Sequence, residues 1–222
     1  MTFLGSLWTD AQRYTPLLLR GALVTLEMTL GAFCIALVLG LVVALCRLAP
    51  WPPLRTVGTA YVELLRAIPP ITWLFIFYFG LSSIGFAFPA LGVAIAGFGL
   101  IGTAYMAEIY RAGIQAVHRG QREAALAVGL TPAGALRYVI LPQAVPVVMP
   151  PAANYLIGLL KDSAIASTIG ATELLFNART VISSTMHSMQ LYVLAALIYL
   201  VMSWPLGLLA QHLERRVPAP SG

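Results

Sequence analysis

The sequence predicts an all-α integral membrane protein with five transmembrane helices. Hydrophobic residues make up 59% of the 222 residues and charged residues only 9%, whereas an ordinary soluble domain carries about 25% charged residues. The 13 Lys and Arg and 8 Asp and Glu residues are too few to cover so much apolar chain in water. They are scattered singly between apolar runs, so the net charge of +5 does not indicate a nucleic-acid partner. We therefore expect a lipid bilayer as the main solvent.

The spans follow from the uncharged windows. A helix needs about 20 mostly apolar residues to cross the hydrocarbon core of a bilayer. Four windows qualify, and one of them, Ala67–Ala107, is long enough for two crossings. Its centre, Gly80–Pro89, is rich in residues that favour a turn. The five spans are therefore predicted within Met28–Cys46, on each side of Gly80–Pro89, within Tyr138–Leu160 and within Thr180–Leu213.

The arginines predict the orientation of the spans. With five spans the termini lie on opposite sides, and positive residues accumulate on the cytoplasmic side. With the N-terminus outside, the inner segments hold eight basic residues and the outer ones four: Arg47, Arg55, Arg111, Arg119, Arg122, Arg137, Arg215 and Arg216, against Arg13, Arg20, Lys161 and Arg179. We expect the N-terminus outside, the C-terminus in the cytoplasm, and residues 1–15 as a segment lying in the outer membrane interface.

The only long polar interruption between spans, residues 111–142, is predicted to be folded. Gln121–Val128 is rich in helix-forming residues, and Gly129 suits a left-handed helix cap. Thr131 offers an N-cap and Pro132 the first turn of a second helix, which we expect to run until Pro142. A simple reversal of direction is the alternative, but it would need only a handful of residues. A docking surface for another protein is therefore favoured.

This loop also carries a family resemblance. The segment EAALAVGL followed by ILP resembles the EAA loop of type I ABC importer permeases, through Glu123, Ala124, Ala125, Gly129, Ile140, Leu141 and Pro142. Three further segments, Tyr61–Pro70, Tyr105–Val117 and Leu159–Leu175, are similar to the polar amino acid subfamily of the histidine, glutamine and arginine type. The resemblance covers roughly residues 16–216.

The resemblance implies a single permease domain over residues 1–222, with a cytoplasmic coupling helix in the loop between the third and fourth spans. Two permeases, identical or homologous, would join a cytoplasmic ATPase dimer that binds ATP and Mg, while an external solute-binding protein delivers polar amino acids. The resemblance also implies that the protein is located in the bacterial cytoplasmic membrane. A P-loop requires GxxxxGK[ST], but the sole lysine, Lys161, follows Leu160. This chain is therefore expected to be a transport subunit without enzymatic activity or cofactor of its own.

The resemblance and the residue types together assign roles within the coupling loop. Glu123 is the candidate for an electrostatic contact with the ATPase, and Ala124 and Ala125 are candidates for close packing. Gly129 is expected to fix the direction of the coupling helix, and Leu141 and Pro142 complete the motif.

Polar residues in or beside the spans are candidates for the substrate pathway, because ionisable groups in a membrane are costly unless they face protein or water. The candidates are Glu27, Asn154, Lys161, Asp162 and Ser163. For Lys161 and Asp162 a structural ion pair with Glu173 or Arg179 is an open alternative, and for Glu27 a polar contact between helices. Glu63 with Arg66 and Glu108 with Arg111 have the i,i+3 spacing of helical ion pairs.

Some other readings stay open or receive no support. The three histidines, His118, His187 and His212, lie in separate segments without metal-ligand spacing, so no metal site is predicted. Within the importer class, opines, ectoine-like solutes or small amines are alternative substrates. Remote alternatives are an intramembrane serine protease that uses Ser82, and a channel. The proline positions Pro69–Pro70, Pro150–Pro151 and Pro205 are expected to interrupt helices.

Overall fold

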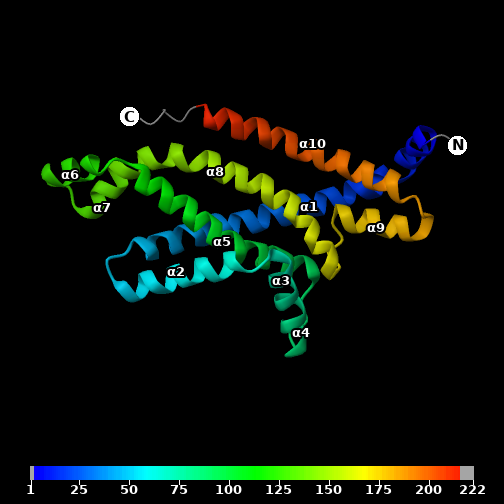
Figure 1. Ribbon diagram of the computed structural model, residues 1–222, viewed down its shortest axis with the longest axis horizontal. Coiled ribbons are helices and arrows are strands. Elements are labelled where there is room, and N and C mark those ends of the chain that lie inside the picture. The colour runs from blue at the N-terminus through cyan, green and yellow to red at the C-terminus, as the bar shows by residue number, and fades with distance from the viewer. Residues whose placement is uncertain (1–2, 216–222) are drawn as a thin grey trace.

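The computed structural model describes residues 3–215, and in this part of the chain every regular element is a helix. Figure 1 shows an elongated bundle in which the long helices lie side by side, with the start of α1 and the end of α10 toward opposite ends. The elements are α1 (Phe3–Leu48), α2 (Pro52–Ala67), α3 (Pro70–Phe75), α4 (Leu81–Ser83), α5 (Ala90–Ala116), α6 (Arg119–Ala127), α7 (Pro132–Ala135), α8 (Leu141–Asp162), α9 (Leu174–Thr185) and α10 (Ser188–Glu214). Two π-helical segments, η1 (Ile76–Gly80) and η2 (Leu136–Ile140), and a 3-10 helix, η3 (Ser163–Ile169), join them.

The number of candidate membrane-spanning helices agrees with the five that the sequence predicts. Among the described residues, four helices are long and apolar enough to cross a bilayer, and a fifth span results when α2 and the α3–α4 arm are counted together. These two parts meet at an angle of 102°, and the arm projects from the side of the bundle in Figure 1. The second span therefore differs from the prediction: it needs α2, which lies before the predicted window Ala67–Ala107, and it bends sharply at the predicted interruption Pro69–Pro70.

The helix α1 is longer than its predicted span. It runs without a break for 46 residues and contains Pro16. The segment 1–15 is thus, from Phe3 onward, the first part of this helix and not a separate element, while residues 1–2 lie outside the described residues. Tyr14 and Leu18 pack against α9 and α10, so contacts with the same chain hold this part of α1. Its predicted place in the membrane interface stays a prediction.

The central contact of the bundle is between α1 and α5, and small residues bring the two backbones together. A Cβ atom at Gly40 would lie 2.6 Å from Cβ of Met106, and one at Gly99 would lie 2.8 Å from Cβ of Ile35. Without a hydrophobic force between helices in lipid, such close packing is the main attraction available. The buried residues Met28, Phe98 and Ile101 belong to the core that results.

Proline affects the later helices less than predicted. The helix α8 continues through Pro146, Pro150 and Pro151, and α10 continues through Pro205. Proline fits the φ angle of a helix, and its cost of about 3 kcal/mol comes from the missing N–H and a clash with the preceding turn. Packing of α8 against α5 and α10 stabilises the continuous helix. The predicted interruptions at Pro150–Pro151 and Pro205 are therefore wrong.

A buried carboxylate joins three helices near the end of the bundle that holds the N-terminus. Glu173 is fully buried and caps α9 by accepting hydrogen bonds from the backbone N–H groups of Leu175 (2.9 Å) and Phe176 (2.7 Å). Tyr199 of α10 donates its hydroxyl to the same carboxylate at 2.8 Å, and the hydroxyl of Thr25 on α1 lies at 3.4 Å. Burial raises the pKa of Glu173, although the bonds from Leu175 and Tyr199 oppose this.

Candidate functional site

The loop after α5 is folded, as the sequence predicts. It contains α6, a turn at Gly129, and α7, which continues into α8. Gly129 has a φ angle of +86°, and the N–H groups of Gly129 and Leu130 donate to the carbonyls of Leu126 and Ala125 at 3.0 and 3.1 Å. These two bonds form a Schellman motif, which requires a left-handed residue. The left-handed cap predicted at Gly129 is confirmed, and the motif fixes the direction in which the chain leaves α6.

The second helix of the loop begins as predicted but does not end at Pro142. Thr131 caps α7, since its Oγ1 accepts a hydrogen bond from the N–H of Gly134 at 3.1 Å, and Pro132 occupies the first turn. The helical path then continues through η2 into α8. The wider π-helical turn lies directly before Pro142, where the proline ring would otherwise meet the preceding carbonyl. The prediction that the helix stops at Pro142 is therefore wrong.

Replacing Thr131 by alanine tests the cap. Loss of the hydroxyl leaves the N–H of Gly134 without its acceptor, which typically costs about 1 kcal/mol. Amide hydrogen exchange at Gly134 and Ala135 is expected to become about fivefold faster, while exchange in α5 stays unchanged. Thr131→Ser, which keeps the hydroxyl, is the control. Equal exchange in all three proteins would contradict a stabilising role for the cap.

The predicted coupling residues differ in exposure. Glu123, Ala124 and Gly129 are exposed, whereas Ala125 is only 5% exposed and packs within the loop. The direct contact with a partner that was predicted for Ala125 is therefore not available. Leu141 is half-buried and Pro142 is exposed where the loop joins α8.

Sequence reasoning missed an apolar surface on the same loop. The side chains of Leu126, Val128 and Tyr138 are 41%, 79% and 66% exposed. Isolated exposed apolar residues are common, but these three lie on one folded loop, and Leu126 and Val128 directly precede the turn at Gly129. A brace joins the first turn of α6 to α8, because the side-chain amide of Gln143 donates to Oε1 of Gln121 at 3.4 Å and to the carbonyl of Val139 at 2.8 Å.

An ion cluster joins α1, α2 and α5. Glu108 accepts from Arg111 at 2.7 Å, as the spacing predicts, and it also lies 3.2 Å from Arg47 and 3.6 Å from Arg66. Arg66 therefore pairs with α5 and not with Glu63, and no ion pair of Glu63 is present in the described part of the chain. Helical spacing predicts only contacts within one helix, so the two arginines from other helices could not be predicted.

A line of aromatic rings extends from this cluster toward α8. The guanidinium of Arg66 lies 5.3 Å from the ring centroid of Tyr105. Tyr105 stacks on Tyr155 with centroids 5.4 Å apart, and Tyr155 contacts Phe33 at 6.4 Å. These contacts connect α2, α5, α8 and α1, and sequence periodicity gave no signal for them.

Lys161 and Asp162 lie at the end of α8 that is farthest from the coupling loop. The 22 residues of α8 span about 33 Å. Both side chains are exposed, and within residues 3–215 neither forms an ion pair. The alternative of a pair with Glu173 or Arg179 is therefore not realised, since Glu173 caps α9. Ser163 is fully buried and donates to the carbonyl of Leu160 at 2.7 Å, so its hydroxyl is not available to a substrate.

The other two pathway candidates are placed apart from this pair. Asn154 donates to Oε1 of Glu214 at 3.0 Å, which joins α8 to the end of α10. Its role is therefore a contact between helices. Glu27 is exposed on α1, and in the described residues it has no hydrogen bond or ion pair. An exposed carboxylate at this position must face water or protein.

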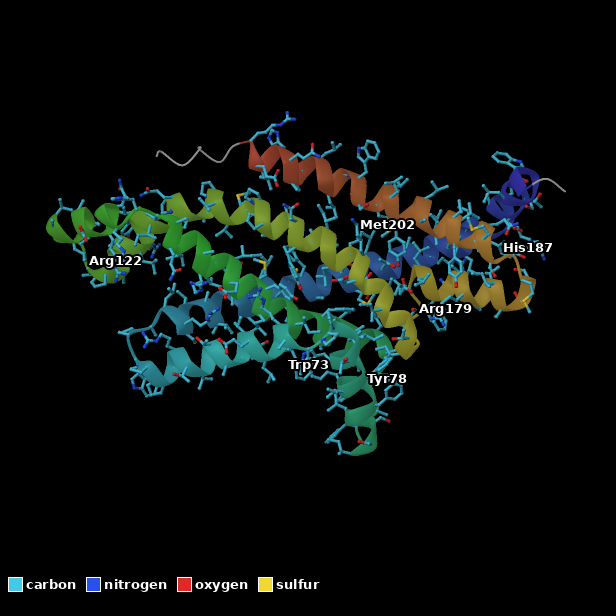
Figure 2. All side chains as sticks on the ribbon, viewed as in Figure 1. Trp73, Tyr78, Arg122, Arg179, His187 and Met202 are labelled. Atoms are coloured by element: carbon cyan, nitrogen blue, oxygen red, sulfur yellow. The ribbon has the colours of Figure 1, made fainter. Side chains whose placement is uncertain are left out.

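The three histidines lie in separate parts of the described chain. In the described residues no group of three or more His, Cys, Asp or Glu side chains could hold a metal ion. His118 caps α6, with Nδ1 accepting from the N–H of Gly120 at 3.1 Å. His187 lies near the start of α1 (Figure 2), where its Nδ1 is 3.0 Å from Oδ2 of Asp10. Ser82 belongs to α4 on the projecting arm (Figure 1), whereas His187 lies at the start of α10, well apart from that arm (Figure 2), so these two residues do not form a protease dyad.

Comparisons with known proteins agree with the predicted family. Residues 36–218 match the family described as binding-protein-dependent transport system inner membrane component. The chain is 38% identical over 193 residues to the probable glutamine ABC transporter permease protein GlnM of Bacillus subtilis (strain 168), covering 87% of this chain and 89% of GlnM. It is 34% identical over 232 residues to the glutamate/aspartate import permease protein GltJ of Escherichia coli (strain K12), covering 99% and 90%.

A solved structure supports the same assignment. A chain in the crystal structure of an amino acid ABC transporter with histidines superposes with a TM-score of 0.89 at 38% identity, covering 97% of this chain and 99% of that one. The agreement of family match, relatives and structure confirms the predicted family and the all-helical membrane fold. The chain therefore belongs to the family of binding-protein-dependent transport system inner membrane components, the permease subunits of ABC transporters.

Proposed function

We propose that this chain is the permease subunit of an ATP-driven importer of polar amino acids in the bacterial cytoplasmic membrane. The observation that carries the proposal is the folded loop at one end of the bundle, in which Glu123, Leu126 and Val128 are exposed around a fixed turn. A loop that only reverses the chain needs neither two capped helices nor an exposed apolar surface. The names of the relatives GlnM and GltJ support an amino acid as substrate.

The partners follow from this assignment. A cytoplasmic ATPase dimer that binds ATP and Mg docks at the exposed face of α6, and Glu123 supplies its charged contact. A second permease, identical or homologous, completes the membrane part, and an external solute-binding protein delivers the substrate. The C-terminus is cytoplasmic and the N-terminus external, because the segments that this orientation places inside carry eight of the 12 arginines.

The continuous helix after the loop provides a mechanism. From Pro132 the helical path runs through η2 and α8 to Asp162 without a loop, and the Gln121–Gln143 brace attaches α6 to it. When ATP binding closes the ATPase dimer, the docked loops move together as rigid bodies. The attached helices then tilt from the inward-facing to the outward-facing state, and hydrolysis reverses the motion.

The exposed, unpaired Lys161 and Asp162 suit a zwitterionic substrate. A free amino acid carries one carboxylate and one ammonium group, and each can pair with one of these side chains by a charge-assisted hydrogen bond. Neighbouring residues on a helix point about 100° apart, so the two side chains do not neutralise each other. Their position at the end of α8 opposite the coupling loop assigns them to the external side of the pathway.

The test is uptake into proteoliposomes that contain the permease, its ATPase and the cognate binding protein. Radiolabelled glutamine, arginine and glutamate are expected to enter only with ATP present. Lys161→Met is expected to raise the substrate concentration for half-maximal uptake about tenfold or more, as loss of a charge-assisted bond predicts. Arg20→Met, which removes an exposed positive charge on α1, is the matched control and should transport normally.

Two outcomes would contradict the proposal. Substrate flux without ATP would indicate a channel. A binding protein that prefers opines, ectoine-like solutes or amines over every amino acid would overturn the substrate class but keep the importer assignment.

A further inference from the structure

Two adjoining cavities lie between the coupling loop and the ends of α1 and α5. Their volumes are about 430 and 330 Å³, within the usual size of small-ligand sites. Leu48, Ile114, Arg122 and Ile140 line both cavities, so the two form one continuous groove. Figure 2 shows Arg122 beside α6 and α7, at the end of the bundle that holds the turn between α1 and α2.

The larger cavity is positively charged. His118, Arg119 and Arg122 line it together with Gln115. Both arginines are exposed, and in residues 3–215 neither guanidinium has an ion-pair partner. The nearby carboxylate of Glu108 is already shared by three other arginines. The cavity therefore presents two free guanidinium groups, which suit the oxygens of a phosphate group.

The smaller cavity is mostly apolar. It is lined by Leu45, Leu48, Leu136 and Ile140, with Pro50 and Ala133 at its border. A groove that is basic at one end and aliphatic at the other matches an amphipathic molecule that has an anionic group and a hydrocarbon chain. A free anion would leave the aliphatic half without a partner, and a hydrocarbon would leave the arginines without one.

The groove also lies where the surface of α1 changes character. The exposed apolar side chains of Leu41, Val42 and Leu45 are followed by Arg47 and then by Trp51, whose side chain is 63% exposed. Arg47 is largely buried against Glu108, so Trp51 is the informative residue, because an exposed tryptophan after an apolar stretch is typical of the membrane–water interface. The groove thus opens at the level of the lipid headgroups on the side of the coupling loop.

We infer that this groove binds an anionic phospholipid of the inner leaflet. The phosphate pairs with Arg119 and Arg122, and an acyl chain lies along Leu45 and Leu48. Basic pockets between membrane helices on the cytoplasmic side bind headgroups in this manner. Because the lipid contacts α1, α5, α6 and η2 at once, it stabilises the position of the coupling loop relative to the spans. The inference rests on the cytoplasmic placement of this loop in the proposed function.

The experiment measures lipid retention by the purified complex of permease and ATPase, using native mass spectrometry with phosphatidylglycerol and phosphatidylcholine as probes. Phosphatidylglycerol is expected to be retained in preference to phosphatidylcholine. Removal of each charge is expected to weaken phosphatidylglycerol binding roughly tenfold or less. The double variant Arg119→Gln and Arg122→Gln is therefore expected to weaken phosphatidylglycerol binding about thirty-fold. Arg55→Gln removes an exposed charge at the same end of the bundle but outside both cavities, and should bind as the wild type does.

A second variant separates the lipid from other ligands of the same charge. Ala133 is exposed at the border of the apolar cavity, so Ala133→Trp fills that half without removing charge. It is expected to weaken phosphatidylglycerol binding about tenfold. Binding of inorganic phosphate as strong as that of the lipid, with Ala133→Trp unaltered, would indicate a free-anion site and overturn the inference.

A protein partner for the arginines is the other outcome to be distinguished. The double variant is tested in two ways: for phosphatidylglycerol retention in the lipid assay, and for ATPase binding in neutral phosphatidylcholine nanodiscs. If it retains phosphatidylglycerol in the first assay but loses the ATPase in the second, the arginines belong to the ATPase interface and the inference is wrong. Equal retention of both lipids by the wild type would also overturn it. Failure of the uptake assay leaves this measurement unaffected, so the two proposals fail separately.

Discussion

Replacing Glu173 by alanine is expected to lower the free energy of unfolding by about 3–5 kcal/mol, because the carboxylate is fully buried and satisfies donors from three helices. Removal leaves the N–H groups of Leu175 and Phe176 and the hydroxyl of Tyr199 without their acceptor. Each such buried donor costs about 1–3 kcal/mol. Thermal unfolding of the purified protein in detergent, followed by intrinsic fluorescence, measures the loss.

The matched control is Glu63→Ala, which removes an exposed glutamate and should change the free energy of unfolding by less than about 0.5 kcal/mol. A loss for Glu173→Ala that is no larger than for Glu63→Ala would contradict the role of the carboxylate as a joint between α1, α9 and α10. Glu173→Gln keeps one oxygen acceptor but introduces an amide donor that faces other donors. It is expected to fall between the wild type and the alanine variant.

The pH dependence of the same variants gives a second readout. Burial raises the pKa of Glu173 above its ordinary value of about 4.3. At a pH between the ordinary pKa of the unfolded state and the raised pKa of the folded state, the folded state binds more protons than the unfolded state. The free energy of unfolding therefore falls as the pH rises through this window. The advantage of the wild type over Glu173→Gln should therefore be largest below pH of about 4 and decrease above it. An advantage that grows with pH would show that the pKa is lowered instead.

The coupling loop could be predicted because its structure depends on local rules. A left-handed cap needs glycine, an N-cap needs a short side chain with an oxygen, and proline fits the first turn of a helix. Gly129, Thr131 and Pro132 satisfy these rules within four residues. Local geometry decides all three positions, so neighbouring helices have little influence on them.

Contacts between distant segments could not be predicted in this way. Nothing in the sequence around Arg66 shows that its guanidinium lies against Glu108 and Tyr105 of α5, because these contacts depend on how α2 packs. The same is true of Asn154, whose partner Glu214 is 60 positions away. The prediction that a helix ends at Pro142 was wrong for a different reason. The π-helical turn before Pro142 accommodates a proline that the local rule treats as a helix stop.

The coupling loop provides the second large effect. Gly129→Val is expected to reduce ATP-driven uptake about tenfold or more, while the amount of protein in the membrane stays unchanged. The φ angle of +86° costs a β-branched residue about 1–3 kcal/mol, although nothing lies within 4 Å of the added Cβ. The backbone relieves this strain by leaving the left-handed region, which breaks the Schellman motif and redirects α6.

Two controls separate a change in direction from a general loss of stability. Gly129→Asn should transport nearly as well as the wild type, because asparagine tolerates the left-handed conformation. Gly85 has a φ angle of +91° and equally open space, but it lies in the turn before α5, far from the coupling loop. Gly85→Val therefore introduces the same strain elsewhere and should leave the ratio of uptake to ATP hydrolysis unchanged. A loss of uptake in Gly85→Val as large as in Gly129→Val would assign the effect to folding, because the turn at Gly129, unlike that at Gly85, fixes the direction of α6, on which the ATPase is proposed to act.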